Sequence, residues 1–304
     1  MAYRYTDTNK WTDNWFCDLK ATSKLLFLYL CDLCDLAGFM EINEKKISFD
    51  LVLGKQEVER GEEIFRVEGL SKTGYYKDVS FSLHKGEILA MTGLVGAGRT
   101  EVCQGIMGIE RPDKGKVILE GKTLSIRHPS DAMKAGIGYL PEDRQKQGLI
   151  LDWGLGQNVT LSTLEKFTKF TVINRKAERE RSKELLEKVK TKALSVFDKA
   201  SSLSGGNQQK VIVAKVLNSD LKVVILDEPT KGVDVGAKAQ IYEIMSELAA
   251  QGFGVIMISS EMPELLRMSD RVVVMCEGVK TGELPIEEAT QEKIMTLATQ
   301  HTGG

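Results

Sequence analysis

A short apolar segment that ends in two acidic residues constrains the fold of this 304-residue chain more than any other feature. Val223 to Leu226 is a continuous run rich in β-branched residues, which is typical of a parallel strand buried on both faces. Asp227 and Glu228 follow it, and ligands of open α/β sheets bind at the carboxyl ends of the strands. One acid can hold the water shell of a metal ion, and its neighbour can polarise an attacking water. The alternative, a buried strand that ends in acids by chance, does not explain the two glycine-rich segments elsewhere in the chain.

The first glycine-rich segment, Gly93 to Thr100, indicates a phosphate site. An apolar segment at 88–91 precedes the sequence GLVGAGRT, and a helical pattern follows it. A strand, a glycine-rich loop and a helix in succession form the context in which such a loop binds phosphates. Because the glycines let the backbone close round the phosphates and Thr100 offers a hydroxyl to magnesium, we expect Thr100 and Asp227 to be metal ligands. The alternative is a purely structural glycine turn.

The second glycine-rich segment is LSGGN at 203–207, and a helical pattern follows it. The first N–H groups of a helix have no partner within the helix, and the helix dipole favours an anion beside them. Ser204, Gly205 and Gly206 therefore form a second candidate phosphate site, upstream of the acidic strand.

Together these segments resemble motifs of the ATP-binding cassette family. LSGGN resembles its signature loop, LDEPT resembles its Walker B segment, and Asp234 falls at the family's D-loop aspartate. The wider set GLVGAGRTE, PEDR, LSGGNQQK, LDEPTKGVDVG and SSEMPE, within residues 62–299, is similar to the carboxyl-terminal cassette of the tandem ATPases of bacterial importers for ribose, galactose, xylose, rhamnose or autoinducer. The resemblance implies an α/β fold of the P-loop NTPase cassette type, with a mixed core sheet, an antiparallel β subdomain and a helical subdomain.

The resemblance also implies the ligands and the site residues. ATP and Mg²⁺ are the expected cofactors, and Glu228 and Asp227 are the expected catalytic residues. The residues expected to bind the nucleotide are Gly93, Gly96, Ala97, Gly98, Arg99, Thr100, Glu101, Glu142, Ser204, Gly205, Gly206, Asn207, Asp234 and Ser260.

Three positions depart from the family pattern. Arg99 stands where the phosphate loop has lysine, Glu142 where the family has glutamine, and Ser260 where active cassettes have histidine. Arginine replaces a compact ammonium with a planar fork, and an ionised carboxylate cannot donate a hydrogen bond. In the resembling ATPases two cassettes pair head to tail, and the degenerate carboxyl-terminal cassette completes its partner's site with its signature. We therefore expect slow ATP hydrolysis here, with Ser204 to Asn207 acting on a nucleotide held by another cassette.

The remaining patterns predict the other elements of such a cassette. Antiparallel strands are expected at 64–68 and 79–83, a hairpin at 115–126, helices at 129–135, 175–192 and 236–250, and strands at 137–140, 254–258 and 272–275, followed by a polar end. The expected parts are a small helical or winged-helix-like segment at 1–53, a charged linker at 54–63, the cassette at 64–299 with its helical subdomain at about 149–202, and a tail at 300–304.

The first 53 residues differ in composition from the rest. They hold two of the three tryptophans and three of the five cysteines, and leucines at 25–36 predict an amphipathic helix. The patterns DTNKWTDNWFCDL, KLLFLYLCDLCDLAG and KISFD resemble the start of phage replication-initiation proteins, where a winged-helix DNA-binding module begins. Six basic against eight acidic side chains provide no basic surface for DNA, so a helical cap is an equal alternative. Cys31 and Cys34 lack a second pair with zinc spacing and are expected to be ordinary thiols.

Composition limits the partners. The 41 basic and 43 acidic residues draw the chain to neither nucleic acid nor lipid. An odd number of cysteines without a signal peptide indicates a reducing, cytoplasmic setting. No segment approaches the roughly 18 consecutive apolar residues of a membrane span, so another subunit must supply any channel. The expected partners are a second cassette, in a homo- or heterodimer, and transmembrane permease subunits, with the chain peripheral on the inner face of the cell membrane. No nucleic acid is expected on the cassette, and DNA stays open only for residues 1–53.

The function expected from these features is energy coupling in a sugar importer. By the resemblance, the helical subdomain and the segment PEDRQKQG receive the coupling helix of a permease. The alternative is an ATP-binding regulator without a transport role, or a DNA-tethered module that uses residues 1–53. Cassette proteins of chromosome maintenance or translation fit less well, because the chain has no long coiled-coil insertion or basic inter-domain arm. Since no amino-terminal cassette precedes this one, we expect a truncated, recombined or artificially joined gene.

Overall fold

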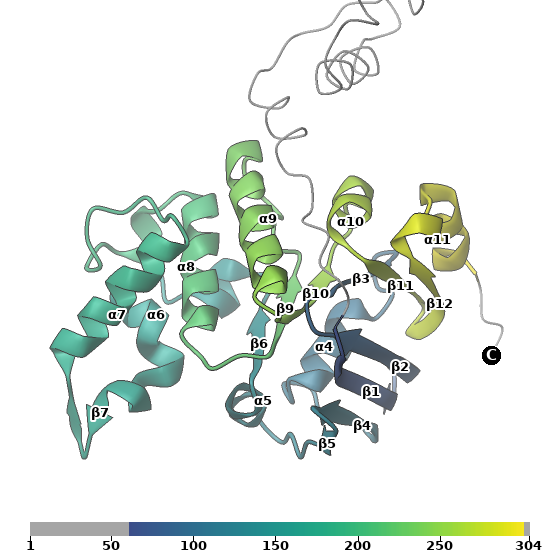
Figure 1. Cartoon of the computed structure of the whole chain (residues 1–304), viewed down its shortest axis with the longest axis horizontal. Helices are drawn as coiled ribbons and strands as arrows, with labels where there is room; N and C mark the ends of the chain where they lie inside the picture. The colour runs from purple at the N-terminus through teal and green to yellow at the C-terminus, as the bar shows by residue number, and fades with distance from the viewer. Residues whose placement is uncertain (1–60, 301–304) are drawn as a thin grey trace, which may run out of the picture. The chain divides into compact units, whose positions relative to one another are not determined.

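The computed structural model describes residues 61–300 of the chain. The small segment expected at 1–53, the linker before residue 61 and the tail after residue 300 lie outside the described residues. Within them the chain forms a large mixed sheet, a smaller antiparallel sheet and a group of helices at one end of the large sheet (Figure 1). These are the three structural parts that the sequence predicts.

The large sheet has the strand order β12-β11-β3-β10-β9-β6. Its strands are β3 (Ile88–Gly93), β6 (Ile137–Leu140), β9 (Val223–Asp227), β10 (Gly254–Ile258), β11 (Arg271–Cys276) and β12 (Val279–Pro285). β12 pairs antiparallel with β11, and the other five strands are parallel. Every residue of β9 and β10 is buried, as expected of continuous apolar runs that helices cover on both faces.

The smaller sheet is antiparallel and has the strand order β2-β1-β4-β5. Its strands are β1 (Glu63–Lys72), β2 (Tyr76–His84), β4 (Lys114–Leu119) and β5 (Lys122–Thr123). Glu120 and Gly121 join β4 to β5 with φ angles of 49° and 73°, the positive values of a tight type I′ hairpin turn. The expected hairpin therefore forms, but its second strand ends at Thr123. Leu124 and Ile126, which were expected to belong to it, pack against the hydrophobic core instead.

Helices cover both faces of the large sheet. The helices α9 (Val235–Ala250), α10 (Met262–Met268) and α11 (Gln291–Ala298) pack on one face, and α4 (Arg99–Ile106) and α5 (Pro129–Ala135) lie on the other (Figure 1). One core cluster joins α4 to the small sheet and to the inner strands of the large sheet. A polar end was expected after the strand at 272–275, but this segment contains β12 and α11, and α11 buries Ile294 and Ala298.

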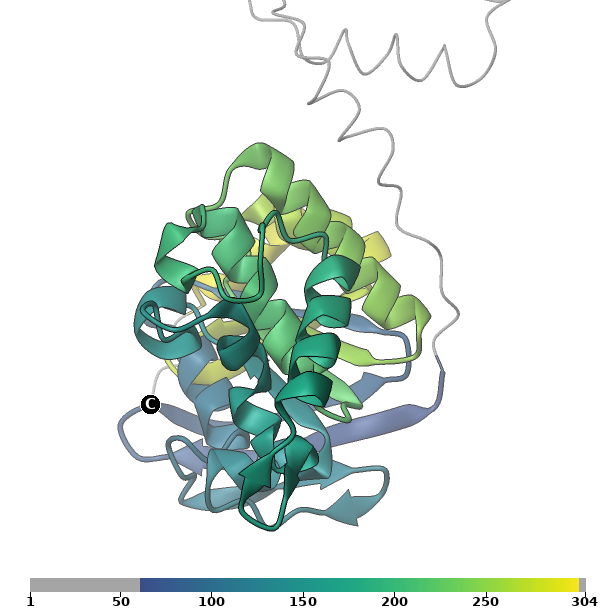
Figure 2. The ribbon, with the colours of Figure 1, turned by 90° about the vertical axis from the view of Figure 1, so that its left-hand side faces the viewer.

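A group of helices lies beyond β6, and Figure 2 shows the molecule from that side. It consists of α6 (Leu155–Thr160), α7 (Arg175–Lys188) and α8 (Gly205–Leu217), which pack against one another. The helical pattern did not predict the small hairpin between them, formed by β7 (Thr168–Lys169) and β8 (Val172–Ile173). The remaining short helical turns of residues 61–300 are η2 (Arg144–Gly148), η3 (Leu161–Phe167), η4 (Ala200–Ser202) and η5 (Ile286–Glu288).

The register of the parallel strands brings three loops to one edge of the large sheet. Asp227 at the end of β9 pairs with Ile258 at the end of β10, and Ile258 pairs with Met91 of β3. The glycine-rich loop after β3, Glu228 after β9 and Ser260 after β10 therefore leave from adjacent strands. The candidate site lies at the carboxyl edge of the sheet, where open α/β sheets bind ligands.

Candidate functional site

The glycine-rich loop turns tightly between β3 and α4. At Gly93 a Cβ atom would lie 2.2 Å from the carbonyl oxygen of Met275, so only glycine fits beside β11. Gly98 precedes α4 with a φ of 89°, and no side chain caps the helix. The first N–H groups of α4 therefore have no partner within the helix and are available to an anion.

The exposed part of this loop is held from one side by the turn between β11 and β12. The N–H of Gly278 donates to the carbonyl of Ala97 at 3.1 Å, and Ala97 in turn donates to Leu94 at 3.0 Å. Of the two adjacent tyrosines near the loop, Tyr76 is buried and Tyr75 is 52% exposed. Of this pair, Tyr75 alone can therefore stack on a nucleotide base.

Asp227 and Thr100 meet as expected for metal ligands. The Thr100 hydroxyl donates to Oδ1 of Asp227 at 3.2 Å, and the Tyr139 hydroxyl donates to Oδ2 at 2.9 Å. Burial raises the pKa of Asp227 to about 6, although the two hydroxyls act in the opposite direction. A buried carboxylate beside a hydroxyl is an all-oxygen donor set of the kind that Mg²⁺ prefers, and a cation there would relieve the cost of burying the charge. The residues present therefore fit magnesium.

Glu228, the acid expected to polarise water, is held by two of the three residues that depart from the family pattern. The Ser260 hydroxyl donates to its Oε2 at 3.2 Å, and Nη1 of Arg99 lies 3.8 Å from its Oε1. Arg99 also donates to the carbonyl of Ser259 at 3.3 Å. The arginine of the phosphate loop thus contacts both the residue after β10 and the acid after β9.

Glu142 forms an ion pair that sequence reasoning missed. Its partner is Lys231, the residue that follows LDEPT, and the hydrogen bond to Glu142 raises the pKa of Lys231. The only signal in the sequence was a basic residue directly after the Walker B motif. The charge introduced by Glu142 is therefore offset by a lysine from the neighbouring loop.

The signature residues lie apart from these groups. Ser204 precedes α8 and is exposed, and the Asn207 amide donates to its hydroxyl at 3.0 Å. Asp234 caps α9 by accepting from Ala237 at 3.0 Å. A Cβ on Gly206 would lie 3.6 Å from Asp234 Oδ2, so the α8 and α9 starts are neighbours. Among residues 61–300 no hydrogen bond or ion pair joins the signature to Asp227 or the phosphate loop, and Figure 1 shows α8 and α4 on opposite sides of β6.

Glu101, the remaining candidate, lies in the first turn of α4. Its carboxylate adds negative charge where the helix dipole favours an anion, and among residues 61–300 no hydrogen bond or ion pair joins it to the acids that end β9. The support for Glu101 as a nucleotide-binding residue is therefore limited to its position next to Thr100.

A family model described as ABC transporter matches residues 76–231, about half of the chain. The chain belongs to this family. The matched region begins in β2 and contains the phosphate loop, the signature and both acids of β9. It thus covers every candidate site residue of the cassette except Asp234 and Ser260.

Sugar-import ATP-binding proteins are similar to this ABC protein in sequence. Ribose import ATP-binding proteins RbsA of Oceanobacillus iheyensis and Lacticaseibacillus paracasei are 46% and 48% identical over 80% and 81% of this chain, covering 49% and 50% of their own length. A putative ribose/galactose/methyl galactoside import ATP-binding protein of Rhizobium etli is 47% identical over 82% of this chain and 47% of its own. The chain spans about half the length of the curated relatives it matches.

Solved cassettes confirm the fold. A nucleotide-free ATP-binding cassette from an ABC transporter has a TM-score of 0.66 at 24% identity, covering 79% of this chain and 96% of that chain. A dimeric bacterial ABC transporter cassette has a TM-score of 0.64 at 20% identity, covering 73% and 99%. Within residues 61–300 no helix is both long and apolar enough to cross a membrane.

A buried carboxyl group connects two loops of the site. Glu264 of α10 accepts from the Thr230 hydroxyl at 2.9 Å and from the Ser259 hydroxyl. Burial raises the pKa of Glu264 although these hydroxyls act against the shift. Glu264 thereby ties the loop after Glu228 to the loop before Ser260. The motif SSEMPE contains Glu264, but the sequence alone indicated no role for this residue.

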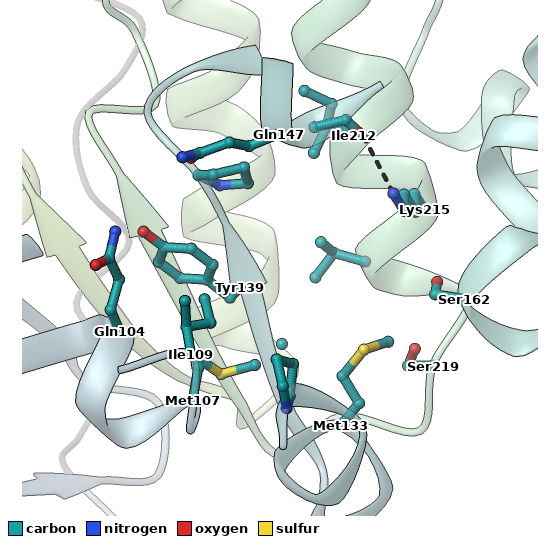
Figure 3. Close-up of a pocket in the computed structure, with 15 residues that line it drawn as sticks. Gln104, Met107, Ile109, Met133, Tyr139, Gln147, Ser162, Ile212, Lys215 and Ser219 are labelled. Atoms are coloured by element: carbon teal, nitrogen blue, oxygen red, sulfur yellow. Dashed lines mark hydrogen bonds between the residues drawn. The ribbon is translucent and has the colours of Figure 1, made fainter. Parts of the chain in front are cut away.

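A groove of about 350 Å³ lies next to the site, between the large sheet and the helices beyond β6 (Figure 3). Lys215 of α8 donates to the carbonyl of Gly148 at 3.1 Å, and burial lowers its pKa. The hydroxyls of Ser162 and Ser219 have no partner among residues 61–300. The other lining residues are Gln104, Met107, Ile109, Pro129, Met133, Gly138, Tyr139, Pro141, Gln147, Gly148, Ile212 and Val216.

Proposed function

We propose that this chain is the ATP-binding, energy-coupling subunit of an ABC sugar importer, and that it is a degenerate cassette with weak hydrolysis of its own. The observation that carries the proposal is the set of contacts on Glu228, whose carboxylate is held by Arg99 and Ser260 beside an otherwise complete phosphate and metal site. The sugar-import names of the relatives support the transport role.

The loop from Gly93 to Thr100 binds the phosphates of ATP through its backbone N–H groups, and Thr100 and Asp227 hold the metal. Mg²⁺ held by these residues would supply positive charge that offsets the negative charge of the phosphates. The base of ATP stacks on the exposed ring of Tyr75. These contacts need neither a lysine in the loop nor a histidine after β10, so ATP binding persists in this cassette.

Hydrolysis is slow because three charge contacts differ from those of an active cassette. Arg99 has a planar guanidinium group where the family's lysine has a compact ammonium, and this guanidinium pairs with Glu228. Ser260 carries no imidazole, and Glu142 cannot donate a hydrogen bond while it is ionised. Each electrostatic contact that is absent from the transition state costs about two or more powers of ten in rate.

The signature at Ser204 to Asn207 acts on a nucleotide held by a second cassette. Ser204 is exposed at the start of α8, and among residues 61–300 no hydrogen bond or ion pair joins the signature to the phosphate loop of the same chain. The relatives are about twice as long as this match, which leaves room in them for a second cassette. One solved neighbour is a dimeric cassette, so the fold supports such pairing.

The groove receives a segment of the permease, which places the chain on the inner face of the cell membrane. Its apolar walls accept an apolar side chain, and Lys215 offers a partly buried ammonium to a carbonyl or carboxylate of that segment. Co-expression with the membrane subunits of a ribose importer tests this contact. We expect co-purification in detergent that Lys215→Glu abolishes, and co-purification unaffected by that substitution would contradict the contact.

Nucleotide-dependent pairing tests the cassette role most simply. Analytical ultracentrifugation of the purified full chain is expected to show a dimer with Mg²⁺ and ATP, and a monomer without them. Ser204→Glu places a negative charge against the partner's nucleotide and should abolish the dimer while nucleotide binding persists. Ser202→Glu, an equally exposed change two residues earlier, is the matched control. A dimer that forms equally without ATP, or that the Ser204→Glu variant still forms, would refute the proposed pairing.

A further inference from the structure

One side chain belongs both to the groove and to the candidate metal site. The ring of Tyr139, on β6, lines the groove, as Figure 3 shows. Its hydroxyl donates to Oδ2 of Asp227 at 2.9 Å. β6 and β9 are neighbouring parallel strands, and Tyr139 pairs with Ile225, two residues before Asp227. The phenol thus spans from the groove wall to the carboxyl edge of the sheet.

The Tyr139 hydroxyl determines how the Asp227 carboxylate is oriented. Asp227 is fully buried, and its other oxygen, Oδ1, accepts from Thr100 at 3.2 Å. With one donor on each oxygen, the plane of the carboxylate is fixed relative to Thr100. Loss of the Tyr139 hydroxyl would leave Oδ2 buried without this donor, and a buried acceptor without a donor destabilises its surroundings.

The ring is bounded by a cavity on its groove side. Gln104 of α4 lines the same groove, so the groove extends from Tyr139 to the helix that begins at the phosphate loop. Met133 of α5 lines the same groove. A side chain that fills the cavity restricts the ring and stabilises the hydrogen bond at its far end.

We propose that Tyr139 is a positioning residue that aligns Asp227 for the metal. We propose also that Tyr139 couples the filling of the groove to metal binding at Asp227. An apolar side chain of a permease segment in the groove strengthens metal-dependent nucleotide binding through this phenol. The inference rests on the proposed function, because that function makes Asp227 a metal ligand and the groove a permease site. By reciprocity, bound metal and nucleotide favour an occupied groove.

The first test is Tyr139→Phe in the full chain, with the affinity for a fluorescent ATP analogue measured with and without Mg²⁺. We expect the affinity without Mg²⁺ to stay within about twofold, and the enhancement by Mg²⁺ to fall about tenfold, as for loss of a hydrogen bond to a charged group. The matched control is Tyr76→Phe, since Tyr76 is also a strand tyrosine, more deeply buried than the half-buried Tyr139, but its hydroxyl has no partner among residues 61–300. Tyr76→Phe should change neither affinity.

The outcomes of this test separate the inference from the proposed function. If Mg²⁺ does not enhance the affinity of the wild-type chain for the ATP analogue, the proposed function and this inference are overturned together. Wild-type enhancement that survives Tyr139→Phe would overturn the inference alone. An equal loss of affinity with and without Mg²⁺ would also overturn it, because a merely structural role weakens both.

The second test fills the groove. Met133→Trp enlarges a side chain that lines the groove and is not one of the candidate nucleotide-site residues. We expect it to raise the enhancement by Mg²⁺ about threefold in the wild-type background and to have no effect in the Tyr139→Phe background. Such dependence of one substitution on another measures the coupling between the two residues. Equal effects of Met133→Trp in both backgrounds would overturn the transmission through Tyr139.

Discussion

Nη1 of Arg99 lies 3.8 Å from Oε1 of Glu228, and both side chains are about nine-tenths buried. The cation of the phosphate loop is thereby paired with the acid expected to polarise the attacking water. Ser260 donates to the other oxygen of the same carboxylate. Two of the three replaced family positions thus act on one functional group, which is the basis of the slow hydrolysis that we propose.

Restoring the family residues should restore turnover. The double substitution Arg99→Lys with Ser260→His replaces the fork with a compact ammonium and supplies an imidazole near the terminal phosphate. We expect the ATPase rate to rise by about two powers of ten, the scale of one electrostatic contact in a transition state. Phosphate release by the purified full chain measures it. Adding Glu228→Gln should remove the gain, and no gain in the double variant would mean that the defect lies elsewhere.

The pair of Glu142 and Lys231 should matter for the charge of the site. Lys231→Ala leaves the Glu142 carboxylate uncompensated near the phosphates, so we expect the affinity for Mg-ATP to fall about threefold to fivefold, the scale of an exposed ion pair. The compensating variant Lys231→Ala with Glu142→Gln removes both charges and should recover the affinity. Calorimetric titration measures both. If the double variant binds as weakly as the single one, the pair does not act through its charge.

Buried Glu87 should contribute stability that depends on pH. Burial would raise its pKa, but Arg271 and His84 lower it below the usual value of 4.5. A lowered folded pKa means that the contribution is complete above pH 4.5 and is lost as the pH falls through the folded pKa. Glu87→Gln should cost about 3 kcal/mol at pH 7, the scale for breaking a buried pair, and less below pH 4.

Denaturant unfolding of the full chain at both pH values measures this cost. The matched control is Glu62→Gln, because Glu62 is exposed and pairs with Lys85 at the surface. Its cost should stay below about 1 kcal/mol at either pH. A cost of Glu87→Gln that does not change with pH would show that the lost contact is not ionic.

Gly98 should tolerate no side chain. Its φ of 89° would be strained for any residue other than glycine at this position, and a Cβ would lie 3.1 Å from the carbonyl oxygen of Tyr75. Gly121 has a similar φ of 73° but nothing within 4 Å of a Cβ. We expect Gly121→Ala to cost about 1 kcal/mol of unfolding free energy and Gly98→Ala more, together with loss of nucleotide binding. Thermal unfolding and a nucleotide titration measure the two effects, and equal costs would mean that crowding at Gly98 is unimportant.

The strands of the large sheet were predictable because burial on both faces leaves continuous apolar runs. The expected strands at 137–140 and 254–258 match β6 and β10 at both ends. Helix α11 was missed because its segment is polar and it buries only Ile294 and Ala298. The hairpin of β7 and β8 was missed because two-residue strands carry no periodicity.

The candidate site was predictable where a residue belongs to a local motif. Thr100 and Asp227 meet as the motifs indicate. The contact of Tyr139 with Asp227 and that of Lys231 with Glu142 join residues 88 and 89 positions apart. Such contacts depend on strand register and loop path, which no local pattern contains. The roles of these residues stay predictions until they are measured.

The measurement that tests the central claim most directly is Mg²⁺-dependent ATP binding and hydrolysis by the purified full chain, beside Glu228→Gln. We predict saturable, Mg²⁺-dependent binding with turnover near the background rate, unchanged by the substitution. Robust turnover that Glu228→Gln abolishes would contradict the account. It would mean that Arg99 and Ser260 suffice for catalysis and that two copies of this chain form a self-contained ATPase.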